Sequence, residues 1–322
     1  MQAKVSPERS ATSVYVGIDV CKDRLDVHIH PAGQSLQVRN DAAGLKKLKR
    51  MLANFAVACV VMEATGKFHR AAHRSLHASG IAVAVVNPLR SRLFAQALGT
   101  LAKTDKIDCK ILAILGEKIE PSAKAPVSEA MEELQELVRC RDAAVANLTA
   151  LRNQLGATRS PSATVEIKRQ IRATESAIEN LTAKTEQQIK SDPALARQWE
   201  VITSIPGLGG VTAAALIAGL VEIGSMSAKQ VAMLVGLAPI AQDSGESSGA
   251  RHIRGGRPHL RRALYMAAVT AARCNPPLSA FYDRMIAEGK NPKVALTAVM
   301  RKLAVLANSL VAQNRLWTPI AP

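Results

Sequence analysis

The sequence predicts an α/β domain followed by two mainly helical regions. Short apolar runs alternate with amphipathic segments over residues 1–127, three-four apolar spacing fills residues 128–192, and Gly-containing turns separate apolar helical segments over residues 193–322. Charge changes at nearly the same places: 19 basic and 10 acidic residues precede Ser128, nine of each lie from Ser128 to Lys190, and 14 and 7 follow. A length of 322 residues favours two domains at roughly 150 residues each, with the middle region as a connector.

The composition indicates a folded protein with a polyanionic partner. The net charge is +16 and the pI is about 10.0, yet hydrophobic residues make up 48% of the chain, which excludes a largely disordered basic protein. Aromatic residues are only 3%, so recognition by many stacked bases is disfavoured and contacts to phosphates and duplex shape carry more weight.

The cysteines and apolar runs suggest a protein of the reducing cytoplasm. Five cysteines show no CxxC spacing, which argues against a disulfide framework or a cysteine zinc site. The first 13 residues are polar, and the longest apolar runs, such as Val211 to Val221, are too short to span a bilayer. We therefore expect no export signal and no membrane partner.

The first region is expected to form a mixed sheet flanked by helices. Asp41 can cap a helix that runs to Ala53, and Asn87-Pro88 closes the last strand. The expected strands are Val14–Val20, Arg24–His30 and Ser35–Arg39, which form an antiparallel meander, and the buried runs Val57–Met62 and Ile81–Val86, with a further helix over Lys67–Ala78 between them.

Four carboxylates occur where a metal site would need them. Asp19 and Glu63 stand at the ends of two predicted strands, and Thr104 can cap a helix that carries Asp105 and Asp108 on one face. Gathered carboxylates repel one another unless a cation intervenes, and Mg²⁺ prefers such oxygen ligands. Spacing alone favours an ordinary structural interpretation, in which Asp19 ends a strand and Glu63 begins a loop. Asp105 and Asp108 would then stabilise a helix N-terminus.

The middle region is expected to be a helical hairpin. Met131, Leu134 and Val138 begin a three-four apolar pattern that runs to Leu155, and a break at Gly156 to Pro161 precedes a second helical stretch. The hairpin is either a connector packed on its own chain or a coiled coil that joins two protomers.

The third region opens with a segment that resembles a helix-hairpin-helix. Gly207 and Gly209 belong to a Pro-Gly-x-Gly turn between two apolar helical stretches, from Ile202 to Leu216. Such glycines let the backbone approach a phosphate, and the second helix presents its N-terminal amides. The alternative is an ordinary tight turn between helices.

A serine-rich loop and a basic segment follow. Eleven Lys or Arg and only two acids lie between Arg251 and Lys302, a density that marks a phosphate-facing surface. A serine beside arginines can attack phosphorus when it is activated, although serines in Gly-rich loops are mostly loop residues. The candidate nucleic-acid-binding residues are Gly207, Gly209, Arg251, Arg254, Arg257, Arg261, Arg262 and Lys302.

Seven ordered motifs together resemble one family, the DEDD-type transposases of the insertion-sequence "one-ten" family, whose relatives include the pilin-inversion DNA invertases. The resemblance covers nearly the whole chain. The motifs are Val16-Gly-Ile-Asp19, Met62-Glu-Ala-Thr-Gly66, Val86-Asn-Pro88, Lys103-Thr-Asp-Lys-Ile-Asp108, Ser204-Ile-Pro-Gly-Leu-Gly209, Gly236-Leu-Ala-Pro239 and His259-Leu-Arg-Arg-Ala-Leu-Tyr-Met266.

The resemblance implies a RuvC-like, RNase H-type domain over residues 1–127, in which Asp19, Glu63, Asp105 and Asp108 bind Mg²⁺, with Mn²⁺ as a substitute. It also implies a coiled-coil insertion over residues 128–192 and a transposase domain over residues 193–322. The family's nucleophilic serine, in a Ser-Gly motif, aligns with Ser244; Ser247 and Ser248 are nearby competitors. Cys109 in place of alanine, and Gln242-Asp243 before the serine, depart from the family pattern and put loop geometry in doubt.

The family mechanism implies DNA strand exchange between a donor and a target duplex that a structured noncoding bridge RNA brings together. Several active sites must act at once, so the resemblance implies a homodimer or homotetramer in the bacterial cytoplasm or nucleoid. Two other classes stay open. One is a metal-dependent nuclease or Holliday-junction resolvase without a serine–DNA intermediate, and the other is a noncatalytic nucleic-acid-binding protein, which the presence of all four acids disfavours.

Overall fold

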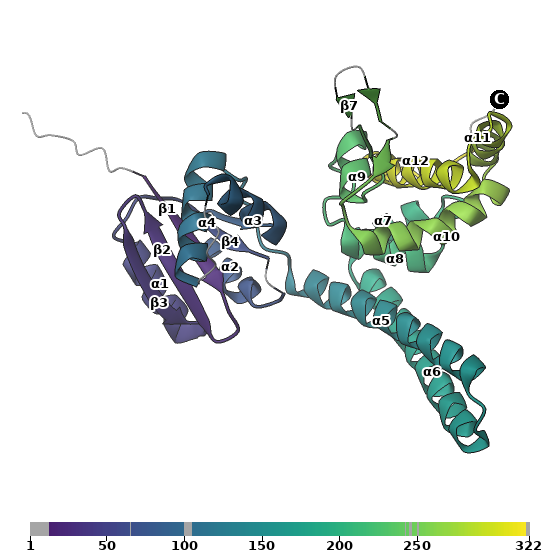
Figure 1. Cartoon of the computed structure of the whole chain (residues 1–322), viewed down its shortest axis with the longest axis horizontal. Coiled ribbons are helices and arrows are strands. Elements are labelled where there is room, and N and C mark those ends of the chain that lie inside the picture. The colour runs from purple at the N-terminus through teal and green to yellow at the C-terminus, as the bar shows by residue number, and fades with distance from the viewer. Residues whose placement is uncertain are drawn as a thin grey trace, which may run out of the picture. The chain divides into compact units, whose positions relative to one another are not determined.

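The chain divides into two compact units, Met1–Val127 and Ser128–Pro322 (Figure 1). The computed structural model describes residues 13–64, 66–99, 105–241, 243–244, 247–249 and 251–319.

The first unit is built on a five-stranded mixed sheet. Strands β1, β2 and β3 form an antiparallel meander, and β4 and β5 run parallel to β1, in the order β3-β2-β1-β4-β5. The predicted meander and mixed sheet are therefore confirmed. The strands are β1 (Val14–Val20), β2 (Arg24–His30), β3 (Gln34–Arg39), β4 (Val57–Glu63) and β5 (Val83–Val86).

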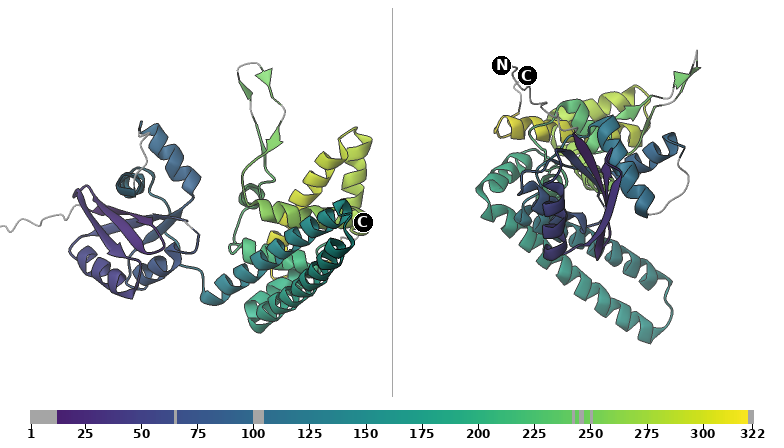
Figure 2. Two further views of the ribbon diagram at one scale, coloured as in Figure 1. Left: turned by 60° about the horizontal axis from the view of Figure 1, so that its bottom comes forward. Right: turned by 90° about the vertical axis from the view of Figure 1, so that its left-hand side faces the viewer.

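Helices cover both faces of this sheet (Figure 2, left view). One core joins the sheet to α1 and α2 through residues such as Leu48 and Leu76, and a second core joins the opposite face to α3 and α4 through Phe94 and Leu112. The helices are α1 (Ala42–Leu52), α2 (His69–His77), α3 (Pro88–Ala97) and α4 (Asp105–Ile119). As expected, the Asp41 carboxylate caps α1 by accepting the Gly44 amide at 2.8 Å. The cap expected at Thr104 lies outside the described residues.

The absence of a side chain at Gly17 allows α4 to lie directly on β1. A Cβ atom added at Gly17 would overlap the carbonyl oxygen of Cys109 and lie 2.5 Å from the backbone nitrogen of Ala113. Both obstacles are helix backbone, which cannot rotate away as a side chain can. The Gly in the Val-Gly-Ile-Asp motif therefore sets the distance between the sheet and the helix that carries Asp105 and Asp108.

Replacing Gly17 by valine should destabilise the first unit by about 3 kcal/mol, because the new side chain must push α4 off the sheet. Urea unfolding combined with amide hydrogen exchange in β1 and α4 measures the effect. Gly156→Ala is the control, since a Cβ there meets nothing within 4 Å. Unchanged exchange in the Gly17 variant would contradict this account of the packing.

The second unit begins with a long helical hairpin, α5 (Glu129–Ala157) and α6 (Pro161–Ser191). At the end of the hairpin away from the turn between its helices, Leu134 and Ile189 are buried. Val145, nearer to that turn, is 38% exposed. Two arginines that interrupt the apolar pattern reach across to α6: Arg141 donates to Thr182 at 3.0 Å and Arg152 pairs with Glu175 at 2.8 Å. Polar contacts between the helices thus replace part of an apolar seam.

Within the described residues, six further helices and a β-hairpin follow in the second unit. They are α7 (Pro193–Thr203), α8 (Gly210–Gly219), α9 (Ala228–Leu234), α10 (Pro258–Cys274), α11 (Pro276–Ala287) and α12 (Pro292–Ala312). Helix α10 packs on α8, α11 and α12, and the hairpin helices α5 and α6 pack on α8. Gln135 of α5 also donates to the carbonyl of Ala218 at 3.1 Å.

Helix α12 is the most apolar long helix among the described residues. Its 21 residues, with a mean hydropathy of 1.5 over its best window, are long and apolar enough to cross a bilayer by length and composition. Arg301 and Lys302 interrupt this stretch, so it is not one continuous apolar run in the sequence. In the structure α12 packs on α7, α9, α10 and α11 and buries residues such as Val299 and Leu303, as core helices of apolar composition do.

Candidate active site

The register of the sheet places Asp19 and Glu63 side by side on the central strand β1 and its neighbour β4. Ile18 of β1 pairs with Met62 of β4 in parallel, and Asp19 and Glu63 are the next residues of these strands. The expected strand Val14–Val20 is confirmed, with Asp19 as its last residue but one. Both carboxylates are half-buried and lie at the carboxyl ends of adjacent parallel strands.

Both residues belong to the face of the sheet that α3 and α4 cover. Side chains alternate along a strand, so Asp19 shares the face of Tyr15, and Glu63 that of Val61, which pack in the core formed with Leu112 of α4. Asp108 lies one helical turn before Leu112 and is half-buried, so it belongs to the same side of α4. Asp105 begins this helix, and its side chain lies outside the described residues.

Ser91 of α3 contacts Glu63 directly, and the sequence analysis missed it. Its hydroxyl donates a short hydrogen bond to Oε1 of Glu63 and lies 3.0 Å from the carbonyl oxygen of Pro88. The side chain is only 4% exposed. The Asn87-Pro88 motif positions it, because the Asn87 side chain accepts the Leu89 amide at 2.8 Å and Pro88 starts the helix.

Replacing Ser91 by alanine should weaken the apparent affinity for Mg²⁺ about tenfold, because a carboxylate that loses its orienting hydrogen bond is a poorer ligand. Calorimetric titration of Mg²⁺ into the full chain measures the shift. Ser79→Ala is the control, since Ser79 is exposed just after α2 and its hydroxyl donates to the carbonyl of Ser75. Identical Mg²⁺ curves for the two variants would rule out an orienting role.

Asp26 of β2 is a further acidic residue at this site that the sequence analysis did not single out. It pairs with Asp19 across the antiparallel register and is 7% exposed. Arg24 and Gln37 donate to its two oxygens at 3.1 and 2.7 Å, so its charge is compensated within the fold. The alternation of Arg24–His30 could have revealed it, because it puts Asp26 on the same face as Arg24 and His28.

The negative charge of this region acts on Cys109 of α4. Burial, followed by the charges of Asp26 and Asp19, raises the pKa of the Cys109 thiol to about 11. The thiol is therefore protonated at neutral pH and adds no negative charge beside the carboxylates. Cys109, one of the departures from the family pattern, fits the buried position as a small apolar residue.

The donor chemistry of the site fits a hard divalent cation. Asp19, Glu63 and Asp108 offer carboxylate oxygens on one side of the sheet, which Mg²⁺ and Mn²⁺ accept. Among the side chains that the structure describes, no three His, Cys, Asp or Glu lie close enough together to form a metal site as they stand.

The serine region is a two-stranded hairpin, where the sequence suggested only a loop. Strand β7 (Asp243–Ser244) pairs with β8 (Ser247–Ser248), so that Ser244 lies opposite Ser247. Closer to the helices, β6 (Pro239–Ile240) pairs with β9 (His252–Ile253). Figure 1 shows this hairpin projecting beyond α9. Ser244 thus stands in the second unit, and the four acids belong to the first.

The two glycines of the turn between α7 and α8 have different roles. Gly207 has φ +103°, and a Cβ there would lie 2.5 Å from the Cβ of Ala271 on α10; its lack of a side chain serves helix packing. Gly209 is exposed, has open space around it, and precedes the uncapped N-terminus of α8. Of the two, only Gly209 has the surroundings expected of a phosphate contact.

The six basic residues among the nucleic-acid-binding candidates also divide into two groups, those that bond to the chain itself and those that are exposed. Arg257 donates to the carbonyl of Gly219 and lies 3.3 Å from Glu222, and Arg261 donates to the carbonyls of Gly236 and Gly255. These contacts fix the chain around the root of the hairpin. The exposed residues are Arg251, Arg254, Arg262 and Lys302.

Comparison with known proteins shows which family this chain belongs to. A model of transposases of the DEDD IS110 type matches residues 16–158, and a model of the IS116/IS110/IS902 transposase family matches residues 199–283. The "Pilin gene-inverting protein" of Moraxella bovis is 30% identical over 319 residues, covering 94% of this chain and 97% of the relative; that of Moraxella lacunata matches equally. The "Insertion element IS110 uncharacterized 43.6 kDa protein" of Streptomyces coelicolor is 36% identical over 104 residues, or 32% of this chain and 26% of the relative.

These similarities define an enzyme that cleaves and rejoins DNA, a DNA transposase or recombinase. The chain belongs to the IS110 family of transposases. It therefore acts on DNA, and its family suggests the use of a divalent metal ion.

Proposed function

We propose that this enzyme exchanges DNA strands at specific sites, using Ser244 as nucleophile and the acids Asp19, Glu63, Asp105 and Asp108 as ligands of Mg²⁺. The observation that carries the proposal is the placement of Asp19 and Glu63 at the ends of the central strand β1 and its neighbour β4, beneath the helix that bears Asp105 and Asp108. The strand order β3-β2-β1-β4-β5 supports a RuvC-like, RNase H-type domain over residues 1–127. In the proposed organisation, residues 128–192 are a coiled-coil connector and residues 193–322 the transposase domain.

The proposed reaction is phosphoryl transfer through a serine–DNA link. The Ser244 oxygen attacks the scissile phosphorus, its proton passes to a base, and the bond to the leaving deoxyribose oxygen breaks as that oxygen takes up a proton. Strand exchange follows when the corresponding hydroxyl of the other DNA attacks the phosphoserine and releases Ser244. Mg²⁺ bound by the acids would stabilise negative charge on the phosphate during each transfer.

Exposed cations of the second unit support DNA binding beside the serine hairpin. Arg251 and Arg254 follow β8, and Arg262 lies on α10. Burial lowers the pKa of His259, one turn from Arg262, so this histidine is largely neutral at pH 7 and the arginines carry the positive charge. Such cations hold the backbone phosphates without reading base sequence.

We propose that target choice comes from a structured noncoding bridge RNA that pairs with donor and target DNA. A protein with a net charge of +16 and 3% aromatic residues is suited to hold RNA–DNA duplexes by shape and phosphate charge. A single RNA, encoded beside the gene, should copurify with the protein and be identified by sequencing. Recovery of a random sample of cellular RNA would overturn guidance and leave only electrostatic binding.

Strand exchange between two duplexes needs several active sites, and we propose a homodimer or homotetramer assembled through α5 and α6. Light scattering of the protein bound to DNA gives the number of chains. A monomeric complex that is active in strand exchange would overturn this assembly.

The serine mechanism is tested by trapping its covalent product. A suicide duplex, nicked so that the cleaved strand diffuses away, should leave the full chain attached to DNA after denaturation. Peptide mass spectrometry should then locate the modified residue at Ser244. Efficient cleavage of the same duplex without any adduct would instead favour a metal-dependent nuclease or junction resolvase in which water attacks.

A further inference from the structure

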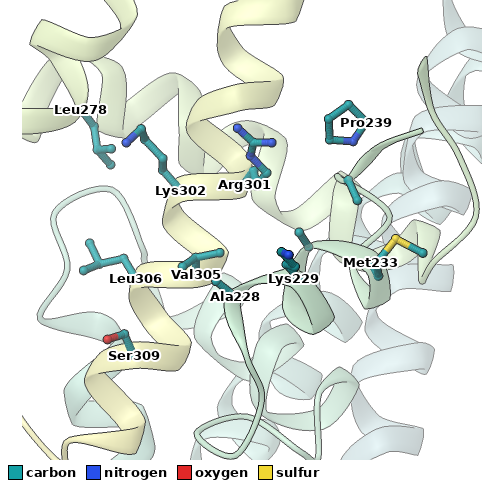
Figure 3. Close-up of a pocket in the computed structure, with 12 residues that line it drawn as sticks. Ala228, Lys229, Met233, Pro239, Leu278, Arg301, Lys302, Val305, Leu306 and Ser309 are labelled. Atoms are coloured by element: carbon teal, nitrogen blue, oxygen red, sulfur yellow. The ribbon is translucent and has the colours of Figure 1, made fainter. Parts of the chain in front are cut away.

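A cavity of about 810 Å³ lies in the second unit among α9, α11 and α12 (Figure 3). Its volume falls within the roughly 300–1,000 Å³ typical of sites that enclose a small molecule. The wall is mainly apolar, with Met233 of α9, Leu278 of α11, and Val305 and Leu306 of α12 among the lining residues. Met233 is 55% exposed, so this large apolar side chain is accessible from solvent.

The charges of the cavity are all positive. Lys229, Arg301 and Lys302 line it and no carboxylate does. In the part of the chain that the structure describes, none of the three forms an ion pair with an acid. Lys302 lies 4.5 Å above the ring of Phe281, while the guanidinium group of Arg301 lies between Lys302 and Pro239 in the view of Figure 3. An apolar interior with unpaired cations suits a ligand that has both an apolar ring and an anionic group.

The cavity adjoins the root of the serine hairpin. Ala238 and Pro239 line it, β6 begins at Pro239, and Ser244 follows five residues later in β7. The opening of the cavity therefore lies near the point where the chain enters the serine hairpin. Ala238 and Pro239 belong to the Gly236-Leu-Ala-Pro239 motif and Lys302 is one of the candidate nucleic-acid-binding residues, whereas the rest of the lining belongs to neither set, so the cavity extends beyond the site already described.

We propose that this cavity binds one unpaired nucleotide of the DNA, with the base against Met233 and Val305 and a flanking phosphate on Arg301 and Lys229. The inference rests on the proposed strand exchange, which separates bases beside the cleaved bond. Thioether and aliphatic groups pack favourably on the flat faces of any base, and guanidinium binds phosphate through two parallel hydrogen bonds. The site holds an unstacked base without aromatic side chains, which agrees with their scarcity in the chain.

Binding of two short duplexes to the full chain tests this proposal. They are identical except that one carries a single unpaired 2-aminopurine nucleotide. Fluorescence anisotropy should show about tenfold tighter binding of the bulged duplex, and 2-aminopurine emission should change on binding. Arg301→Ala and Ala228→Trp, which fills the opening from an exposed position, should abolish the preference and leave binding of the paired duplex within about twofold.

Lys293→Ala and Val294→Trp are matched controls, because both residues are exposed on the same helix α12 and neither lines the cavity. Both should retain the preference. Equal binding of the two duplexes by the unmodified chain, or a preference that survives in Ala228→Trp, would overturn the nucleotide site while leaving covalent trapping at Ser244 intact. A changed oligomeric state in Ala228→Trp, with both DNA affinities unchanged, would overturn it in favour of a protein interface.

Discussion

Replacing Ser244 by alanine is expected to abolish the protein–DNA adduct and to lower strand exchange by at least about 10⁴-fold, because removal of a nucleophile leaves only binding and charge stabilisation. DNA binding should persist, since the lost hydroxyl contributes one weak contact among many phosphate contacts. Denaturing gels with the suicide duplex measure the adduct, and anisotropy measures DNA affinity.

The matched control is Ser248→Ala. Ser248 lies in the paired strand of the same hairpin, opposite Asp243, so the substitution changes a similar backbone environment without removing the proposed nucleophile. It should keep the adduct and most of the activity. If Ser244→Ala still cuts and rejoins DNA at the normal rate, the serine mechanism is wrong; if only Ser248→Ala loses the adduct, the nucleophile is Ser248.

The second large effect is expected from Asp19→Asn and Glu63→Gln. Each replaces a charged ligand by a neutral amide of the same shape, so the fold should be retained while strand cleavage falls on the order of 10³-fold. Calorimetric titration should show that each variant loses most of its affinity for Mg²⁺. Removal of divalent metal with a chelator should reduce the unmodified chain to the same level, and added Mg²⁺ or Mn²⁺ should restore it.

Glu117→Gln provides the control for these variants. Glu117 lies on α4 like the proposed ligands Asp105 and Asp108, and its carboxylate pairs with Lys118 at 2.8 Å and with His30 at 3.5 Å. Its loss should alter neither Mg²⁺ binding nor cleavage. Normal cleavage by Asp19→Asn would remove the metal site from the mechanism, whereas a parallel loss in Glu117→Gln would point to general damage to α4.

The sequence predicted the elements of the first unit well because each has a strong local signal. Val14–Val20 and Val57–Glu63 are continuous apolar strands with an acid at or near the end, and Asp41 has the side chain that a helix N-cap requires. Periodicity therefore located Asp19 and Glu63 before the register was known. It could not show that they are neighbours, since pairing of β1 with β4 depends on contacts between distant segments.

The residues that were missed act through tertiary contacts. Nothing in the local sequence distinguishes Ser91 from other helical serines; its contact with Glu63 arises from the packing of α3. Asp26 is recognised as part of the site only from the strand register, which places it opposite Asp19. The local motif predicts that Gly207 contacts a phosphate; what the motif could not show is that Ala271, 64 positions along the chain, packs where a side chain would be. Local patterns of glycine and arginine do not distinguish packing from ligand binding.

The contacts of Arg257 and Arg261 affect how an alanine scan of this basic stretch should be interpreted. Arg261 holds the chain where it leaves α9, at Gly236, and where it returns, at Gly255. Its removal would loosen the root of the serine hairpin as well as subtract one cation, so a loss of DNA affinity in this variant would combine a structural effect with the loss of counterion release. Alanine variants of Arg251 and Arg254 are easier to interpret, because a change in the salt dependence of their DNA affinity reports only the phosphate contacts that are lost.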